Sequence, residues 1–354
     1  MASNWERRWQ PLLEQWVVVS ARSAARPWSG AMATGTQTHT VEHDPECYLC
    51  PNVVRANGIQ NPDYKNAFAF DNDFPAISFD APEPTHNPDA SLLELTAPAH
   101  GQCRVLCWSE YHNATLASLS ESKMQQVAML WRDEYNSLSA KPDIANVLIF
   151  ENKGKEIGVS NLHPHGQIYA TPFVTDTANR MRRAQASYAK KNNGNSLIQD
   201  LLYRAHTQEH LLIEAGQFFS VIVPFAARFA YETWIVPNSH IGSVQQMSDA
   251  HLKELAQLYQ RQVRRYDLLF ERSAPNVTLL HNMPCDHDSA DAPDNEHWCF
   301  HLAFQPPLRE PDKLKFLAGF ESGSNNIVNS VQPEQAALQF KKIDVEQWLS
   351  LIHI

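Results

Sequence analysis

Two long amphipathic runs dominate the pattern of apolar and polar positions along the chain. Each follows a serine and repeats its apolar residues at the three- and four-residue spacing of a helix. Because a serine side chain can accept a hydrogen bond from a free N–H at a helix start, Ser120 and Ser248 are predicted N-caps. The apolar faces are Met124, Val127, Leu130, Trp131 and Tyr135 in the first run, and Leu252, Leu255, Leu258, Tyr259 and Tyr266 in the second.

Short β-rich runs surround both predicted helices in the same order. Each half then passes through a polar loop to a strand that carries a histidine, His165 or His301. We therefore expect an α+β fold of two tandem related units, each an antiparallel sheet with a long helix, over residues 1–175 and 176–354. Residues 176–212 indicate a charged helical connection. The β-rich runs are Cys103–Trp108, Asn146–Phe150, Phe219–Val223, Thr233–Val236 and Asn276–Leu280.

Net charge, apolar runs and cysteine content argue against three classes of protein: nucleic-acid binders, membrane proteins and disulfide scaffolds. The formal net charge of −10 argues against a general nucleic-acid binder, because the phosphate backbone favours basic surfaces. No apolar run approaches the ~20 residues of a membrane span, and the charged start of the chain does not resemble a signal peptide. Six cysteines in 354 residues are too few for a disulfide scaffold, so we expect reduced thiols and a cytoplasmic protein.

The run His163-Pro164-His165-Gly166-Gln167 carries the clearest chemistry. A glycine-containing polar loop that ends at Ser160 precedes it and can offer N–H groups and a hydroxyl to phosphate oxygens. If the run is extended, His163, His165 and Gln167 project to one side. We expect Gly166 to leave space for a ligand beside His165, whose imidazole is a good nucleophile at phosphorus near neutral pH.

Cys47-Tyr-Leu-Cys50 has the spacing that lets two thiolates share one metal ion. Alone, this motif fits a zinc site, a redox pair or two buried thiols. The other cysteines, at 103, 107, 285 and 299, are expected to pack in the interior.

Nearly end to end, the chain resembles the galactose-1-phosphate uridylyltransferases of the histidine triad superfamily. The matching segments include Arg26–Gly30, His43–Cys50, Asn61–Tyr64, Asn72–Phe74, Glu151–Gly154, His163–Gln167 and Lys315-Phe316. The resemblance implies two histidine-triad-like units and a two-step exchange. UDP-glucose would give its uridylyl group to His165, and galactose 1-phosphate would then take it. It also implies a homodimer in which the partner chain completes the acceptor end of the site.

Further roles are carried over by matching motif. Catalytic roles fall on His165, Gln167 and Ser160, and nucleotide contacts on Arg26, Asn72, Asp73, Asn152, Gly158, Val159, Ser160 and Gln167. Acceptor sugar-phosphate contacts fall on Lys315, Phe316, Phe320 and Glu321. The acceptor region matches less well, since Phe320 replaces a tyrosine of some relatives.

The resemblance also implies a zinc site with four protein ligands, in which His112 and His163 complete the set begun by Cys47 and Cys50. Some relatives hold a second metal with one Glu and three His, but here those positions read Met181, His281, His301 and Ala303. We therefore expect the second site to be absent or very weak.

Two alternatives remain open. One is an adenylyl-transferring phosphorylase or a dinucleotide hydrolase of the same superfamily, although such hydrolases tend to carry a histidine where this chain has Gln167. The other is a catalytically idle nucleotide-binding or metal-stabilised interaction protein, against which the intact His165, Ser160 and Gln167 argue.

Overall fold

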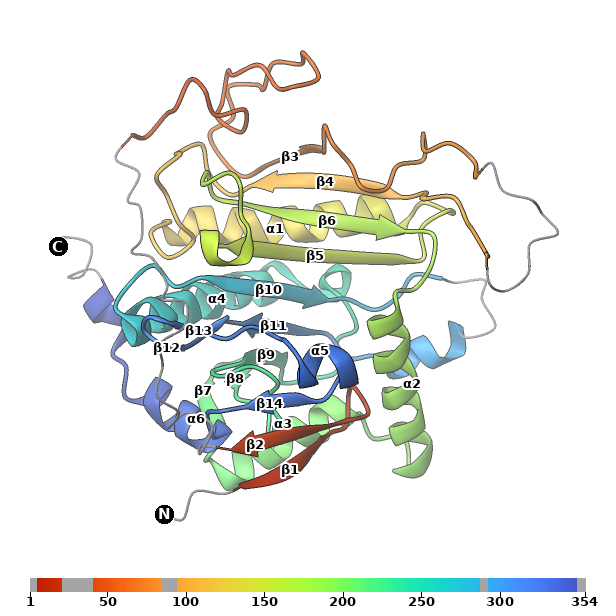
Figure 1. Cartoon of the computed structure of the whole chain (residues 1–354), viewed down its shortest axis with the longest axis vertical. Helices are drawn as coiled ribbons and strands as arrows, with labels where there is room; N and C mark the ends of the chain where they lie inside the picture. Colours follow the sequence, from red (N-terminus) through yellow and green to blue (C-terminus); the bar gives the residue numbers. More distant parts are fainter. Residues whose placement is uncertain (1–4, 21–40, 85–93, 287–291, 349–354) are drawn as a thin grey trace.

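The computed structural model describes residues 5–20, 41–84, 94–286 and 292–348. Within these ranges the chain builds one large antiparallel sheet in the order β3-β4-β6-β5-β10-β11-β9-β8-β7 (Figure 1). Its strands are β3 (Phe68–Asp71), β4 (Gln102–Cys107), β5 (Asn146–Lys153), β6 (His165–Thr171), β7 (Leu212–Ala215), β8 (Phe219–Ile222), β9 (Thr233–Pro237), β10 (Asn276–His281) and β11 (His301–Gln305).

Two long helices, α1 (Glu121–Ser139) and α4 (Asp249–Phe270), pack against one face of this sheet and against each other (Figure 1). Both predicted N-caps are confirmed, because Ser120 Oγ accepts from the N–H of Lys123 and Ser248 Oγ from that of His251, each at 3.3 Å. The predicted apolar faces form the core, with Leu130 only partly buried.

The strand order confirms the duplicated α+β unit. The first half reads β3-β4-β6-β5 and the second β8-β9-β11-β10, with the long helix inserted at the same place in each. The two sheets are continuous, because β5 pairs with β10. For this reason β5 extends to Lys153, beyond the Asn146–Phe150 run of the sequence pattern.

The predicted helical connection forms α2 (Asp176–Lys191) and α3 (Leu197–Gln208). Helix α3 packs against β8, and α2 packs against α3 and the segment Ala292–His297. A small sheet, which the apolar pattern did not predict, joins both ends of the chain through β1 (Trp5–Gln10), β2 (Gln15–Ser20) and β14 (Ile327–Asn329). The remaining elements are η2 (Lys155–Ile157), η3 (Val244–Gln246), η4 (Ala292–His297), β12 (Leu308–Glu310), β13 (Lys313–Leu314), α5 (Phe320–Ser324), α6 (Pro333–Lys341) and η5 (Val345–Gln347).

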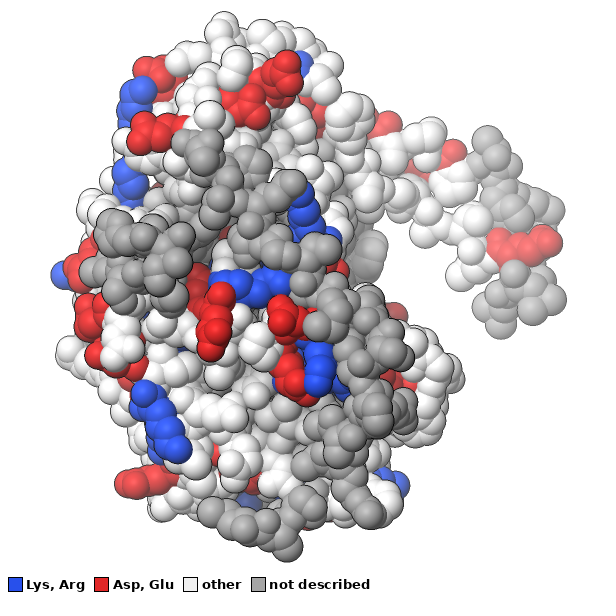
Figure 2. All heavy atoms as spheres, turned by 60° about the vertical axis from the view of Figure 1, so that its left-hand side comes forward, with Lys and Arg blue, Asp and Glu red and all other residues white. Residues whose placement is uncertain are grey.

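The described surface carries both signs of charge. Figure 2 shows acidic and basic side chains interspersed over one face of the molecule. Of the helices in the described ranges, none has the length and apolar character needed to cross a membrane.

Candidate active site and metal centre

His165 is the first residue of β6, opposite Cys107 of β4. Its Nδ1 lies 2.7 Å from the carbonyl oxygen of His163. Because a carbonyl oxygen can only accept, Nδ1 carries the proton and Nε2 keeps its lone pair. Burial lowers the pKa of His165 below its usual value, which favours the neutral ring. The arrangement therefore prepares Nε2 as a nucleophile.

The run is extended only from His165 onward, so the condition for His163 and His165 to project to one side is not met. Strand β6 begins only at His165, and His163 and Pro164 lie in the bend before it. The ring of His163 is instead buried, and its Nδ1 lies 3.5 Å from the Sγ of Cys50. Within the strand the expectation holds, since residues two apart share a face and both His165 and Gln167 are partly exposed.

Gly166 has a different role from the one expected. A Cβ at this position would lie 2.2 Å from Cζ2 of Trp108 and 2.8 Å from the carbonyl oxygen of Phe150. The space beside Gly166 is therefore filled by the Trp108 indole and offers no room for a ligand. Glycine is required here because the strand and the indole pack in contact.

A buried carboxylate fixes that indole. Trp108 Nε1 donates to Glu151 Oε1 at 3.0 Å, and the hydroxyl of Tyr259 on α4 donates to Oε2 at 2.5 Å. Burial raises the pKa of Glu151, whereas these donors lower it. The apolar sequence pattern gave no sign of this network, since Trp108, Glu151 and Tyr259 come from three separate elements.

The loop between β5 and β6 carries several candidate contacts. Asn152 precedes the loop, in β5. Because β5 and β6 are antiparallel and Phe150 pairs with Gln167, Asn152 lies beside His165. Gly158 has a φ of +82° and Ser160 is exposed. Val159 lies between them and is partly buried.

Asn72 and Asp73 follow β3, where the backbone N–H of Asn72 donates to Cys103 at 3.0 Å. Cys103 is four residues from Cys107 along β4, and β4 separates β3 from β6, so Asn72 is displaced from His165 by about 13 Å along the strands and about 10 Å across them, or about 16 Å in all. The carboxylate of Asp73 forms a 3.0 Å ion pair with Arg55. Arg26, the remaining candidate nucleotide contact, lies outside the described residues.

The structure brings the four candidate metal ligands together. The buried donor atoms of Cys47, Cys50, His112 and His163 all lie within 4.8 Å of one another. Cys50 Sγ is 3.7 Å from Nδ1 of His112 and 3.5 Å from Nδ1 of His163. Tetrahedral zinc places neighbouring sulfur and nitrogen ligands about 3.5 Å apart. The donor set and its spacing therefore fit a tetrahedral metal ion.

Residues outside the predicted set orient these ligands. His163 Nε2–H donates to the carbonyl of Ser109 at 2.9 Å, which turns Nδ1 toward the thiols. Asn161 accepts from the backbone N–H of His163 at 2.9 Å and donates to Cys47 Sγ at 3.4 Å. An Asn two residues before a predicted ligand is typical of a turn that the side chain stabilises, so its position in the sequence could have indicated Asn161.

The acceptor candidates form a separate group near α5. Lys315 Nζ pairs with Glu321 Oε2 at 2.6 Å, and Glu321 Oε1 accepts from the backbone of Val328 at 3.0 Å. Phe316 and Phe320 are 55% and 60% exposed. In the described part of the chain, no hydrogen bond or ion pair joins this group to His165 or Gln167 of the same chain.

His281 and His301 face each other across β10 and β11, with ring centroids 4.5 Å apart. Burial lowers the pKa of His281 to about 4. Ala303 and Met181, at the other two positions of the second metal site, are both buried. The prediction that no second metal binds here stays a prediction.

Comparison with solved structures defines the class of fold. The chain is similar to a structure described as "Structure of uridylyltransferase", with a TM-score of 0.75 and 23% identity over 95% of this chain and 97% of that one. It is also similar to an ADP-glucose phosphorylase from Arabidopsis thaliana, with a TM-score of 0.77 and 20% identity over 96% of this chain and 100% of that one. At these identities the similarity concerns the fold alone.

Sequence comparison identifies the family. Residues 2–175 match the family model "Galactose-1-phosphate uridyl transferase, N-terminal domain", and residues 181–352 match its C-terminal domain. A galactose-1-phosphate uridylyltransferase of Haemophilus influenzae is 35% identical over 95% of this chain and 94% of its own length. One of Rattus norvegicus is 34% identical over 93% of this chain and 85% of its own. The chain therefore belongs to the galactose-1-phosphate uridyl transferase family and is a nucleotidyltransferase.

Proposed function

We propose that this chain is a UDP-glucose–hexose-1-phosphate uridylyltransferase that moves UMP from UDP-glucose to galactose 1-phosphate through a covalent uridylyl-His165. One observation carries the proposal: in a chain of this family, His165 donates from Nδ1 to the carbonyl of His163 at 2.7 Å, which leaves Nε2 as the free base. The family name of the curated relatives supports the choice of substrates.

In the first step, Nε2 of His165 attacks the α-phosphorus of UDP-glucose. The bond from this phosphorus to the bridging oxygen breaks, and its electron pair leaves with glucose 1-phosphate. In the second step, a phosphate oxygen of galactose 1-phosphate attacks the same phosphorus, and the P–N electron pair returns to Nε2. Dividing one displacement into two lets the same groups serve both half-reactions.

Neighbouring groups would hold the phosphoryl oxygens and the nucleotide. Gln167, on the same face as His165, can donate its amide N–H, and the exposed hydroxyl of Ser160 can do the same. Of the other expected contacts, Asn152 lies beside His165, Gly158 and Val159 lie in the β5–β6 loop, and Asn72 and Asp73 follow β3. Arg26 lies outside the described residues, and its nucleotide contact rests on the family alone.

We infer that the buried Cys47, Cys50, His112 and His163 hold a zinc ion. Burial, together with the neighbouring Cys47, raises the pKa of Cys50 to about 12, and a divalent cation would reverse this by stabilising the thiolate. With four protein ligands the ion has a structural role, as it leaves no open position for substrate. It would fix His163, whose carbonyl holds Nδ1 of His165.

The zinc inference is tested by elemental analysis of protein purified without added metal. We expect one zinc per chain, and loss of that zinc in a Cys47→Ser/Cys50→Ser double variant. Replacing Cys103, a buried thiol outside the cluster, with Ser is the matched control and should leave zinc content unchanged. Zinc retained by the double variant, or absent from the unaltered protein, contradicts the inference.

We further propose a homodimer in which Lys315, Phe316, Phe320 and Glu321 contact the acceptor sugar phosphate in the partner's site. Two observations support this arrangement. Phe316 and Phe320 are exposed beside the Lys315–Glu321 ion pair, and among the described residues no hydrogen bond or ion pair joins this group to His165 of its own chain. A cytoplasmic location remains a prediction from the sequence, supported by six free cysteines.

The reaction is tested by supplying UDP-glucose or ADP-glucose as donor against a panel of sugar 1-phosphates. We expect UDP-galactose from UDP-glucose and galactose 1-phosphate, with kcat/KM at least ten-fold lower for ADP-glucose. Preference for ADP-glucose, or for inorganic phosphate as acceptor, would favour the phosphorylase alternative.

A further inference from the structure

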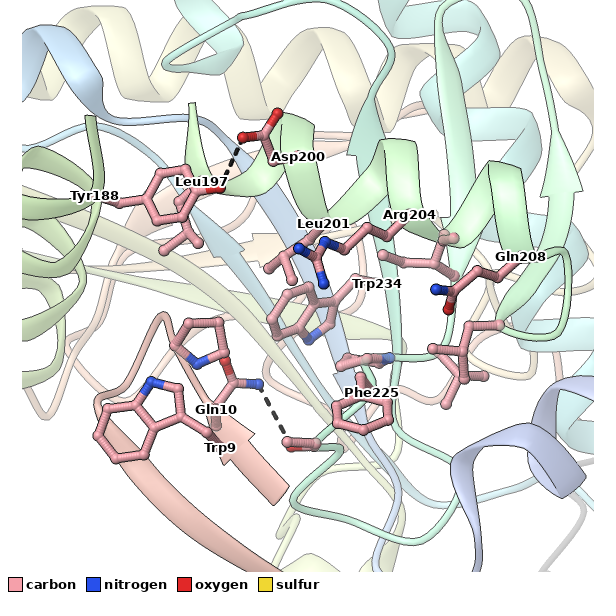
Figure 3. A pocket seen from close by; sticks show the side chains of 17 residues that line it. Trp9, Gln10, Tyr188, Leu197, Asp200, Leu201, Arg204, Gln208, Phe225 and Trp234 are labelled. Carbon is pink, nitrogen blue, oxygen red and sulfur yellow. Dashed lines mark hydrogen bonds between the residues drawn. The ribbon is translucent and has the colours of Figure 1, made fainter. Parts of the chain in front are cut away.

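A cavity of about 380 Å³ lies between β1, α3 and the β8–β9 end of the large sheet (Figure 3). Trp234 and Ile222 line it from the sheet, Leu201 from α3, and Trp9 and Phe225 from the rim. Strand β9 is separated from β6 by three strands, which places the cavity about 19 Å from the strand of His165. The volume falls within the ~300–1,000 Å³ typical of small-molecule sites.

Most polar groups that line the cavity are already hydrogen-bonded. The hydroxyl of Tyr188 donates to Asp200 at 2.7 Å, and Trp234 Nε1 donates to Glu232 at 2.9 Å. Gln10 donates from its amide to a backbone carbonyl at 3.5 Å. The walls therefore present mainly apolar and aromatic surface to a ligand (Figure 3).

Arg204 is the exception. Figure 3 shows its guanidinium pointing from α3 toward Trp234. No carboxylate of the residues that the structure describes lies within ion-pair distance of it. Gln208, four residues further along the same helix, also lines the cavity, so both side chains can donate on one face of α3.

Two exposed aromatic residues form the rim of the cavity. Trp9 is 42% exposed and packs edge-on against Trp16 at 5.4 Å, while Phe225 is 47% exposed. Large aromatic side chains that remain exposed around a cavity are typical of a binding site.

We propose that this cavity binds a small flat aromatic carboxylate, with its ring between Trp9 and Trp234 and its carboxylate on Arg204. Aromatic walls favour a flat apolar body, and a single free guanidinium matches a single negative charge. The carboxylate of Asp200, one helical turn from Arg204, disfavours a phosphate dianion. A sugar phosphate is also disfavoured, because its hydroxyls would leave water for apolar walls.

The test uses 2-naphthoate as the probe and uncharged 2-naphthamide as its control, with binding measured by isothermal titration calorimetry on the full chain. We expect one naphthoate per chain and naphthamide binding at least ten-fold weaker. Arg204→Gln should weaken naphthoate binding about five- to ten-fold, because its charge-assisted hydrogen bond is partly exposed to solvent. Trp9→Ala should have a similar effect, and Arg204→Lys should retain part of the affinity.

Tyr203→Ala is the matched control, since Tyr203 is 68% exposed on the same helix and does not line the cavity. It should bind naphthoate like the unaltered chain. Thermal unfolding of every variant checks that folding is intact. Equal affinity for the acid and the amide, no binding at millimolar probe, or unchanged binding by both Arg204→Gln and Trp9→Ala would overturn the proposal.

Discussion

At the scale of single residues, the position of His165, the proposed nucleophile, depends on side chains on the other face of its strand. Gly166 follows His165 directly and is in contact with Trp108, which Glu151 and Tyr259 hold in place. These groups form the support behind the strand that presents Nε2. An error in this packing would move His165 even though every chemical group of the site is retained.

We expect Gly166→Ala to lower the free energy of unfolding by about 1–3 kcal/mol, because its Cβ would overlap an indole that cannot move away. The transfer rate should fall as His165 shifts. Denaturant unfolding and initial-rate assays measure the two effects.

Gly323→Ala is the control for this substitution, since a Cβ at Gly323 meets no atom within 4 Å. A second variant, Gly166→Ala with Trp108→Phe, should recover part of the lost rate because the smaller ring makes room. A Gly166→Ala protein as stable and active as the Gly323→Ala protein would contradict this explanation.

The sequence indicated which residues of this site carry the chemistry, but it did not indicate which side chains pack against them. The chemistry of His165 follows from its motif, and the pairing of thiols follows from the Cys47–Cys50 spacing. The reason for Gly166 could not be read from the motif, because it lies in Trp108, the residue that directly follows the neighbouring strand β4. Contacts between strands are set by the tertiary fold, which single-sequence patterns do not contain.

At the scale of elements, the segment before β6 connects the candidate metal ligands to His165. Asn161 bonds both Cys47 Sγ and the backbone of His163. The metal cluster thereby joins the loop of Cys47 and Cys50, the segment after β4 that carries His112, and the start of β6.

We expect Asn161→Ala to weaken zinc binding about 10- to 100-fold, as is typical when a group that orients metal ligands is removed. Competition with a chromogenic chelator measures the affinity. The matched control is Asn57→Ala, because Asn57 accepts a similar local hydrogen bond, from the N–H of Ile59 at 2.9 Å, on the exposed surface. An equal zinc affinity in both variants would show that Asn161 does not orient the site.

Element boundaries were predictable where local signals set them. Ser120 and Ser248 begin their helices as expected, because N-capping depends on neighbours in sequence. The β1–β2–β14 sheet was not predicted, because β2 pairs with a strand from the opposite end of the chain.

At the scale of the whole molecule, the second half supports the catalytic loop of the first. Lys153 pairs with Asp267 of α4 at 3.0 Å, and Glu156 pairs with Arg272, just beyond that helix. Together with the β5–β10 pairing, these contacts anchor the β5–β6 loop to the other unit. The two units are therefore joined around His165, although only the first carries this proposed nucleophile.

The proposed dimer predicts complementation between two inactive variants. If each site combines His165 of one chain with Lys315 of its partner, His165→Ala mixed with Lys315→Ala should regain activity after subunit exchange. At equal amounts, about one quarter of all sites would be complete. No recovery, despite mixed dimers detected by mass spectrometry of differently tagged chains, would mean that each site lies within one chain.

The covalent step is the central claim, and intact-mass measurement tests it most directly. Enzyme mixed with UDP-glucose alone should gain the mass of one uridylyl group, and the adduct should be acid-labile, as phosphoramidates are. His165→Ala should gain nothing, whereas Gln167→Ala should still form the adduct, about 10²–10³-fold more slowly, because only a donor to the phosphoryl oxygens is lost. Adding galactose 1-phosphate should remove the group as UDP-galactose. An unaltered protein that turns over substrate without an adduct, or a His165→Ala variant that acquires one, would contradict the account.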